Sequence, residues 1–325
     1  MGAHDDDGNP LAEILASLRV SATRLSLCEF RAPWGLEVPP FASAFVYVML
    51  EGKCLFTGEG IAPRWLQSGD VLLLTRPLKH ATCSQDGVQL TPLAQIWEKR
   101  GYPIWAQDRR GDRIVHVALG EGAELTRMAG MPLQVAPGWG EVFMEGLPPV
   151  ISIPSKTAHI AVWLQAFVAT LNEERPSAGY VPSILRLAEI IFISAIAVHL
   201  DEEREVQGWR RALLDPALSR AIGAIQRDPA RRWTVEELAG VAHMSRSTFA
   251  LRFRTVAGVS PYVFLMELRL RLAADLLLTT NRSSKEIGRS LGYTSPSVFG
   301  AAFKAQFGMS PRRFQAQMAL SRPKR

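Results

Sequence analysis

EELAGVAHMSRSTFALRFRTVAGVSPYVF, from Glu236 to Phe264, is followed further along the chain by KEIGRSLGYTSPSVFGAAFKAQFGMSPRRF, from Lys285 to Phe314. The two stretches align at an offset of 49 residues at their start and of 50 residues from Phe249 onward. From Phe249 onward, the positions that carry the same residue in both copies are Phe249/Phe299, Phe253/Phe303, Gly258/Gly308, Ser260/Ser310, Pro261/Pro311 and Phe264/Phe314. A fixed period of this kind marks a repeated supersecondary unit. Two copies are too few for a solenoid, so the sequence predicts a duplicated module.

Each copy begins with the signature of a helix N-terminus. Thr234 with Glu237, and Ser283 with Glu286, have the spacing of a capping box, in which the two side chains satisfy backbone N–H groups at the start of a helix. The residues that follow are apolar on one face and end at a break, His243-Met244 in the first copy. We therefore expect a short helix followed by a tight turn in both copies.

A second helix is predicted after each turn. Ser245 and Ser295 suit its N-cap, and the paired phenylalanines lie four residues apart, on the face expected to point into the core. The paired glycines suit the left-handed residue that ends a helix, and the paired prolines suit the first position of the next one. A short helix, a turn and a longer helix form a helix-turn-helix, whose second helix lies in the DNA major groove.

The segment Val263–Thr279 joins the two copies and carries apolar residues at helical spacing. At about 1.5 Å per residue, a helix of this length spans roughly 25 Å. Successive major grooves on one face of DNA lie about 34 Å apart. The sequence therefore predicts two helix-turn-helix motifs that read neighbouring grooves.

The segments WTVEELAGVAHMSRSTFALRF, GVSP and GRSLGYTSPSVFGAAFKAQFGMSPRRF resemble the DNA-binding domain of AraC-type transcriptional regulators. The resemblance covers about a hundred residues with both copies in register. It implies a sequence-specific, effector-controlled regulator, with activation as the expected effect. Double-stranded promoter DNA and RNA polymerase are its expected partners, and neither catalysis nor a cofactor is expected.

The same resemblance assigns the residues that meet DNA. The base-reading positions are Arg246, Ser247, Ala250 and Leu251 in the first copy, and Pro296, Ser297, Gly300 and Ala301 in the second. The expected phosphate contacts are Ser245, Arg252, Arg254, Ser295, Lys304, Arg312 and Arg313. Family members often carry arginine where this chain has Leu251 and Ala301, and these two side chains suit contacts with thymine methyl groups instead.

Charge is divided unevenly along the chain. Its formal net charge is +6, yet residues 227–325 carry 17 Lys/Arg against 6 Asp/Glu, which leaves a net −5 on the rest. A basic C-terminal part behind an acidic front suits a module that meets the phosphate backbone with one end only. The acidic N-terminus, MGAHDDDGNP, is no signal peptide, so a cytoplasmic protein without membrane attachment is expected. The three cysteines, without a secretory signal, are expected to be buried thiols.

The front of the chain reads as short strands. Apolar runs at 45–50, 53–57, 71–75 and 114–119 are separated by Gly, Pro, Asp and Gln clusters. Glu51-Gly52 after a strand, and Gly69-Asp70 before another, resemble the cupin-like sensor domain that precedes the DNA-binding domain in many AraC-type proteins. The predicted fold is α+β and multidomain, with a cupin-like β-barrel, a helical connector and an all-α C-terminal domain.

The predicted barrel does not carry the residues of a metal enzyme. A metal-dependent cupin resembles a cage of two or three His and a Glu, whereas the strand region here holds only His80 and His116. A metal-cupin enzyme fused to a DNA-binding domain is therefore the weaker alternative. We interpret the barrel as a small-molecule sensor, with His80 and Tyr47 as candidate effector contacts.

A second candidate effector site lies in the segment Trp97–Arg113, which combines aromatic and basic residues. Arg109 and Arg113 resemble the RxxxR element with which some receptors hold cyclic di-GMP, and Arg110 lies beside them. Guanidinium groups bind phosphate in a bidentate manner and stack on bases. A regulator that responds to a cyclic dinucleotide thus remains an alternative, and so does a solvated basic loop.

Helical patterns follow at 155–172 and 183–205. The second resembles the connector of this family, and its wide apolar face predicts either a homodimer contact or packing on the barrel. The predicted domains are residues 1–150 for the sensor, 151–215 for the connector and 216–325 for the DNA-binding domain. Within the last, the helix-turn-helix motifs are expected at 234–257 and 283–307.

Overall fold

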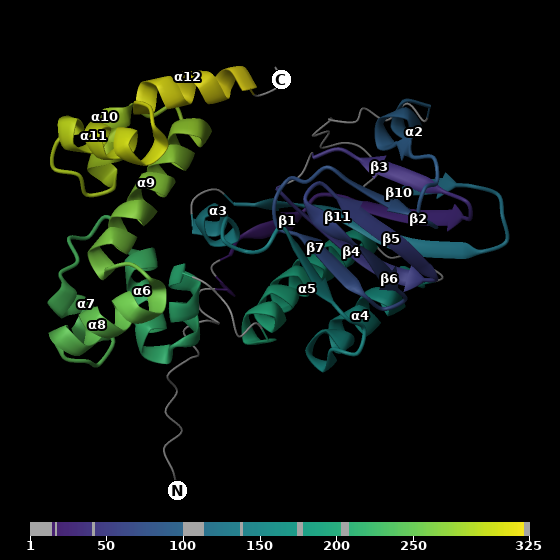
Figure 1. Ribbon diagram of the computed structural model, residues 1–325, viewed down its shortest axis with the longest axis horizontal. Helices are drawn as coiled ribbons and strands as arrows, with labels where there is room; N and C mark the ends of the chain where they lie inside the picture. The colour runs from purple at the N-terminus through teal and green to yellow at the C-terminus, as the bar shows by residue number, and fades with distance from the viewer. Residues whose placement is uncertain are drawn as a thin grey trace, which may run out of the picture. The chain divides into compact units, whose positions relative to one another are not determined.

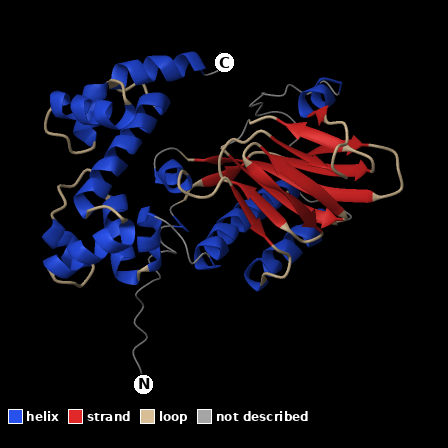
Figure 2. Cartoon of the chain, viewed as in Figure 1, coloured by secondary structure: helices blue, strands red, loops and turns tan. Residues whose placement is uncertain are grey.

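The computed structural model describes residues 15–16, 18–40, 43–99, 114–136, 139–173, 178–202 and 208–321. The chain forms two compact units. One consists of Val20–Val135 and Leu147–Glu202, and the other of Ala136–Gly146, Glu203–Arg325 and the described part of Met1–Arg19. The described strands all belong to the first unit, and the second is helical (Figures 1 and 2).

The strand unit contains two sheets. The larger has the order β10-β2-β11-β4-β7-β12, with β1 paired to β11, and the smaller has the order β6-β5-β8-β3-β9. The strands of the larger sheet are β1 (Val20–Ala22), β2 (Leu25–Arg31), β4 (Ala44–Glu51), β7 (Val71–Leu74), β10 (Ile114–Leu119), β11 (Leu125–Val135) and β12 (Val150–Ile153). Those of the smaller are β3 (Gly35–Val38), β5 (Lys53–Gly58), β6 (Ile61–Gln67), β8 (His80–Cys83) and β9 (Thr91–Pro92).

One apolar core fills the space between the two sheets. It contains Phe30, Trp34, Tyr47, Met49 and Phe56 among other buried side chains. The four strand segments predicted from the sequence correspond to β4, β5, β7 and β10. The sequence predicted a loop from residue 97 onward. This prediction is wrong for residues 97–99, because they belong to the helix α2 (Leu93–Lys99), whose Trp97 is buried in this core.

Two helices complete the strand unit. The helices α4 (Ala158–Leu171) and α5 (Tyr180–Glu202) pack against each other, and α5 also contacts β1, β7 and β12. Glu189 of α5 accepts a hydrogen bond from the backbone N–H of Ala22 at 3.0 Å. By length and composition, Tyr180–Asp201 passes for a membrane-spanning helix. A core helix passes the same test, and its packing on the strands accounts for the apolar sequence.

The helical unit includes α3 (Trp139–Met144), which precedes the rest of the unit in the chain. The rest begins with the 3₁₀ helix η1 (Gly208–Leu214). The helices that follow are α6 (Pro216–Arg227), α7 (Val235–Val241), α8 (Arg246–Ala257), α9 (Pro261–Thr279), α10 (Ser284–Ser290), α11 (Pro296–Phe307) and α12 (Pro311–Ser321). Both predicted capping boxes are present, at the N-termini of α7 and α10. Gly258 and Gly308 end α8 and α11 at φ values of 76° and 71°, in the left-handed conformation that the sequence predicted.

The turn of each helix-turn-helix motif contains a residue with a positive φ, and this residue differs between the two motifs. The turn after α7 places His243 at φ 55°, and the turn after α10 places Gly292 at φ 82°. Glycine adopts this left-handed region without the steric cost that a side chain adds. A methyl group built at Gly292 would lie 2.4 Å from the carbonyl oxygen of Ala230, a contact no side chain there can make.

Candidate DNA-binding surface

The helix α8 has one buried face and one exposed face. Phe249 and Phe253 are fully buried, with ring centroids 5.6 Å apart. The N-cap Ser245 accepts a hydrogen bond from the backbone N–H of Thr248 at 3.3 Å and so fixes where the helix begins. Leu251, on the opposite face, is 70% exposed. Of the predicted base-reading residues of this helix, Arg246, Ser247 and Leu251 are exposed and Ala250 is half-buried.

The helix α11 repeats this arrangement in the second motif. Phe299 and Phe303 are buried, with ring centroids 5.7 Å apart, and Ser295 caps the helix by accepting from Val298 N–H at 3.3 Å. Pro296, Ser297 and Ala301 are exposed and Gly300 is half-buried. Val298 was not among the predicted base-reading residues, yet it is 53% exposed on the same helix.

The helix α9 connects the two motifs and is held at both. Phe264 packs on Phe253 of α8 with ring centroids 5.8 Å apart, and Leu277 belongs to the core cluster that contains Phe303 of α11. Its 19 residues give a length of roughly 28 Å. The helices α8 and α11 are therefore fixed to opposite ends of a single long helix.

Arg269 secures α9 to the start of the first motif. Its guanidinium donates to the carbonyl oxygens of Pro229, Ala230 and Arg231 at 2.6, 3.1 and 2.8 Å. Arg269 is buried, and hydrogen bonds to the three carbonyl oxygens replace those that its guanidinium would form with water. This arginine has a structural task that periodicity in the sequence could not reveal.

The predicted phosphate contacts are not equivalent in the structure. Arg254, Lys304, Arg312 and Arg313 are exposed, as is Ser245, whereas Ser295 is half-buried. Arg252 is also on the surface, but its guanidinium is paired with the carboxylate of Asp215 at 2.7 Å. Asp215 also caps α6, accepting from Ala217 N–H at 3.0 Å. This pairing has no signal in the sequence, because the two residues lie far apart in the chain.

The candidate effector residues Tyr47 and His80 lie together inside the barrel. The Tyr47 hydroxyl and His80 Nε2 form a hydrogen bond of 2.7 Å, and His80 Nδ1 bonds the carbonyl oxygen of Leu78 at 2.8 Å. Burial lowers the pKa of His80 from 6.5 to about 4, so the imidazole is neutral at physiological pH. One ring nitrogen donates to the Leu78 carbonyl, and the neutral Nε2 accepts from the tyrosine.

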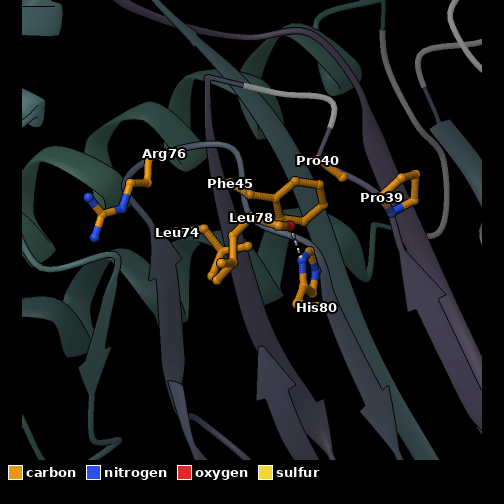
Figure 3. Close-up of a pocket in the computed structure, with 7 residues that line it drawn as sticks. All are labelled: Pro39, Pro40, Phe45, Leu74, Arg76, Leu78 and His80. Carbon is orange, nitrogen blue, oxygen red and sulfur yellow. Dashed lines mark hydrogen bonds between the residues drawn. The ribbon is translucent and has the colours of Figure 1, made fainter. Parts of the chain in front are cut away.

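Little open space remains around this pair. Phe45 and Phe56 pack on the His80 ring, with centroid distances of 6.3 and 5.5 Å. Pro39 and Pro40 are among the residues that line a cavity of about 10 Å³ next to His80 (Figure 3). That is roughly the space that a single water molecule needs. An effector that contacts His80 therefore has to displace side chains of this cluster.

The remaining candidates for chemistry in the strand unit are arginines and cysteines. Arg109, Arg110 and Arg113 lie outside the described residues. Within the described ranges, no cluster of three His, Cys, Asp or Glu side chains is arranged to hold a metal ion. Burial raises the pKa of Cys28 and of Cys54 to about 12, so both thiols stay protonated and are poor nucleophiles.

These two units, a cupin-like double sheet and a pair of helix-turn-helix motifs, define a transcription regulator with an N-terminal cupin domain. Residues 9–201 match the family described as Cupin, and residues 238–317 match the family described as Helix-turn-helix domain. The chain belongs to the AraC family of transcriptional regulators. This confirms the resemblance and the fold class inferred from the sequence.

Relatives match over nearly the whole chain. A protein of Streptomyces antibioticus described as an AraC-like transcription regulator is 32% identical over 307 residues, which cover 93% of this chain and 97% of the relative. The regulator AlkR of Acinetobacter baylyi is 26% identical over 312 residues, covering 94% and 99%. Because these relatives are transcription regulators, the expectation that the chain is not an enzyme is confirmed.

A solved structure of the DNA-binding domain of AdpA in complex with a target DNA is also similar to this chain. It is 32% identical and covers 32% of this chain and 95% of the AdpA chain, with a TM-score of 0.31. Independently of that structure, the helix-turn-helix family match over residues 238–317 and the AraC-like relative identify the helical unit as the DNA-binding domain.

Proposed function

We propose that this regulator reads promoter DNA with the exposed faces of α8 and α11 and that an effector bound by the cupin domain controls this binding. The observation that carries the proposal is the paired exposure of Arg246 and Ser297. Each lies in the first turn of its helix, opposite a buried phenylalanine pair. Arginine at such a position forms bidentate hydrogen bonds with guanine, and serine contacts several bases.

Arg254, Lys304, Arg312 and Arg313 supply the phosphate contacts that position the protein. Their exposed cationic groups and the positive charge of residues 227–325 support this part of the proposal. Arg252 contributes to phosphate binding only when it leaves Asp215.

The effector is a small molecule that enters the barrel beside His80 and Tyr47. This pair forms a buried polar group in a largely aromatic interior, as in ligand sites that use few polar contacts for orientation. The proposed function has four further parts. The protein recruits RNA polymerase, activates transcription, forms a homodimer and is located in the cytoplasm. The predicted sensor, connector and DNA-binding domains at 1–150, 151–215 and 216–325 stay part of the proposal.

Two substitutions test the DNA-binding part. A site is first selected from random duplexes with the full chain, and the dissociation constants of selected and scrambled duplexes are then measured at several salt concentrations. Arg246→Ala is expected to weaken the selected site by ~1–3 kcal/mol with little change on scrambled DNA. Lys304→Ala is expected to weaken both alike. Equal losses on both duplexes for Arg246→Ala would refute its assignment as a base-reading residue.

A further inference from the structure

Residues 136–146 lie between two barrel strands in the sequence but belong to the helical unit in space. The strand β11 ends at Val135 and β12 begins at Val150. The connection between them includes α3, and Ala136–Gly146 cluster with the DNA-binding domain rather than with the barrel. The chain therefore leaves the strand unit, contributes an element to the helical unit and returns.

Aromatic contacts join α3 to the first helix-turn-helix motif. The Trp139 ring lies 5.3 Å from the Trp209 ring of η1, measured between centroids, and Trp209 lies 5.3 Å from Phe264 of α9. Phe264 in turn packs on Phe253 of the recognition helix α8. Ring pairs at such distances stabilise beyond their burial alone. The contacts form one continuous series from α3 to α8.

Phe143 fills the centre of this contact. Its side chain is fully buried, and its ring lies 6.3 Å from Trp209 in an edge-to-face arrangement. A helix of six residues has no stability of its own in water, because nucleation costs more than so few hydrogen bonds return. The fold of α3 therefore depends on the surface that buries Phe143.

Polar contacts fix the register of the segment. Arg210, which is 8% exposed, donates from Nε to the carbonyl oxygen of Phe143 at 3.2 Å. Glu145 forms an ion pair with Arg271 of α9. Gly146 lies directly against the Arg210 guanidinium, where a methyl group in place of its hydrogen would overlap with the cation. Aromatic, hydrogen-bonding and ionic contacts thus agree on one docked position.

We propose that residues 139–146 are an intramolecular docking segment, whose partner is the surface formed by Trp209, Arg210, Phe264 and Arg271 of the DNA-binding domain. The segment completes the core of the first helix-turn-helix motif. Along the chain, its two ends continue into β11 and β12 of the strand unit. The ring and ion-pair contacts described for the segment are made with η1 and α9.

Hydrogen exchange of the full chain, resolved by peptide, tests the docking without requiring an effector or a DNA site. Phe143→Ala is expected to raise amide exchange in η1, in α8 and in the first half of α9 by about tenfold or more, because it empties a buried site. Exchange in α10 and α11 is expected to stay unchanged. Failure of DNA binding would leave this result untouched, so the two proposals can fail separately.

Milder substitutions and matched controls keep the test decisive if Phe143→Ala unfolds the protein. Gly146→Ala and Glu145→Gln are expected to raise exchange in the same peptides by a smaller factor. Gly240→Ala places the same methyl group in open space in α7 and should not reproduce the effect. Phe167→Ala empties an equally buried site in α4 of the strand unit and should affect that unit alone. Unchanged exchange of α8 and α9 in both Gly146→Ala and Glu145→Gln would overturn the proposal.

Discussion

The guanidinium of Arg252 donates from Nε and from Nη2 to one carboxylate oxygen of Asp215, at 2.7 Å in both cases. The other carboxylate oxygen of Asp215 caps α6. The Asp215 side chain thus fixes the start of α6 and also pairs with the guanidinium of Arg252 on α8.

This pairing predicts opposite effects for two charge changes on DNA binding. Asp215→Asn retains an oxygen for the cap but releases Arg252, so DNA affinity should rise and the salt dependence of log K should steepen by about 0.9. Lys304→Ala should reduce that slope by the same amount. The slopes are measured by titration of full-length protein with a fixed duplex at several salt concentrations. An unchanged slope for Asp215→Asn would show that the released Arg252 does not reach phosphate.

Leu251 predicts a contact with a thymine methyl group. Leu251 is 70% exposed on α8, the helix that we propose faces the major groove, and so has an apolar surface available for that group. Replacement of thymine by uracil, one position at a time in a selected site, should weaken binding of the wild type at one position by about 1 kcal/mol. Leu251→Ala should bind both versions of the site equally. A wild type that is indifferent to every uracil would contradict the assignment, although Arg246 could still read DNA.

The two turns of the duplicated module predict different responses to small changes of side chain. Gly292→Ala should destabilise the helical unit by more than about 1 kcal/mol, because alanine is strained at positive φ and its methyl group meets the Ala230 carbonyl. His243→Gly, at the equivalent turn, should be close to neutral, since relief of strain and the added freedom of the unfolded chain offset each other. Thermal unfolding measures both, with Gly240→Ala as the control. Equal destabilisation by Gly292→Ala and Gly240→Ala would be inconsistent with this view of the turn.

The capping box at α7 predicts an acid-sensitive contribution to stability. Glu237 accepts hydrogen bonds from Thr234 and Arg231, and these lower its pKa from 4.5 to about 2. A lowered carboxyl pKa contributes stability that is complete above pH 4.5 and is lost as pH falls toward 2. Glu237→Gln should therefore reduce the difference in unfolding free energy between pH 5 and pH 2.5. An identical pH dependence in wild type and variant would argue against the contribution.

His80 predicts that the barrel also loses stability as the pH falls, but in a less acidic range than the capping box at α7. Its folded pKa of about 4 lies below the usual 6.5, so the unfolded chain binds a proton that the folded chain does not bind between these values. The stability contribution is present above pH 6.5 and is lost as pH falls toward 4, by at most about 3 kcal/mol. Unfolding of His80→Gln should vary less over this range than unfolding of the wild type does. A His80→Gln profile that matches the wild type would remove the buried imidazole as the cause.

Local patterns predicted most of the DNA-binding domain. The capping boxes, the paired phenylalanines and the glycines with positive φ are set by neighbours within a few residues, so their spacing is visible in the sequence. Contacts between distant segments were not visible. Asp215 with Arg252, and Phe143 with Trp209, have no periodic signal, because they depend on tertiary packing alone.

The strand unit was predicted less completely for a related reason. Strands such as β8 and β12 are four residues long, too short for alternation of polar and apolar side chains to stand out. The pairing of Tyr47 with His80 depends on the arrangement of β4 and β8 in different sheets. Sequence spacing alone therefore identified both residues as candidates without predicting their hydrogen bond.

Footprinting of the full chain on a selected duplex tests the central claim most directly, namely that two recognition helices on one connecting helix read successive major grooves. We expect two protected regions on one face of the DNA, about 10 base pairs apart. Arg246→Ala should weaken protection in one region, and Ser297→Ala in the other. A single protected region, or loss of the same region in both variants, would contradict the account.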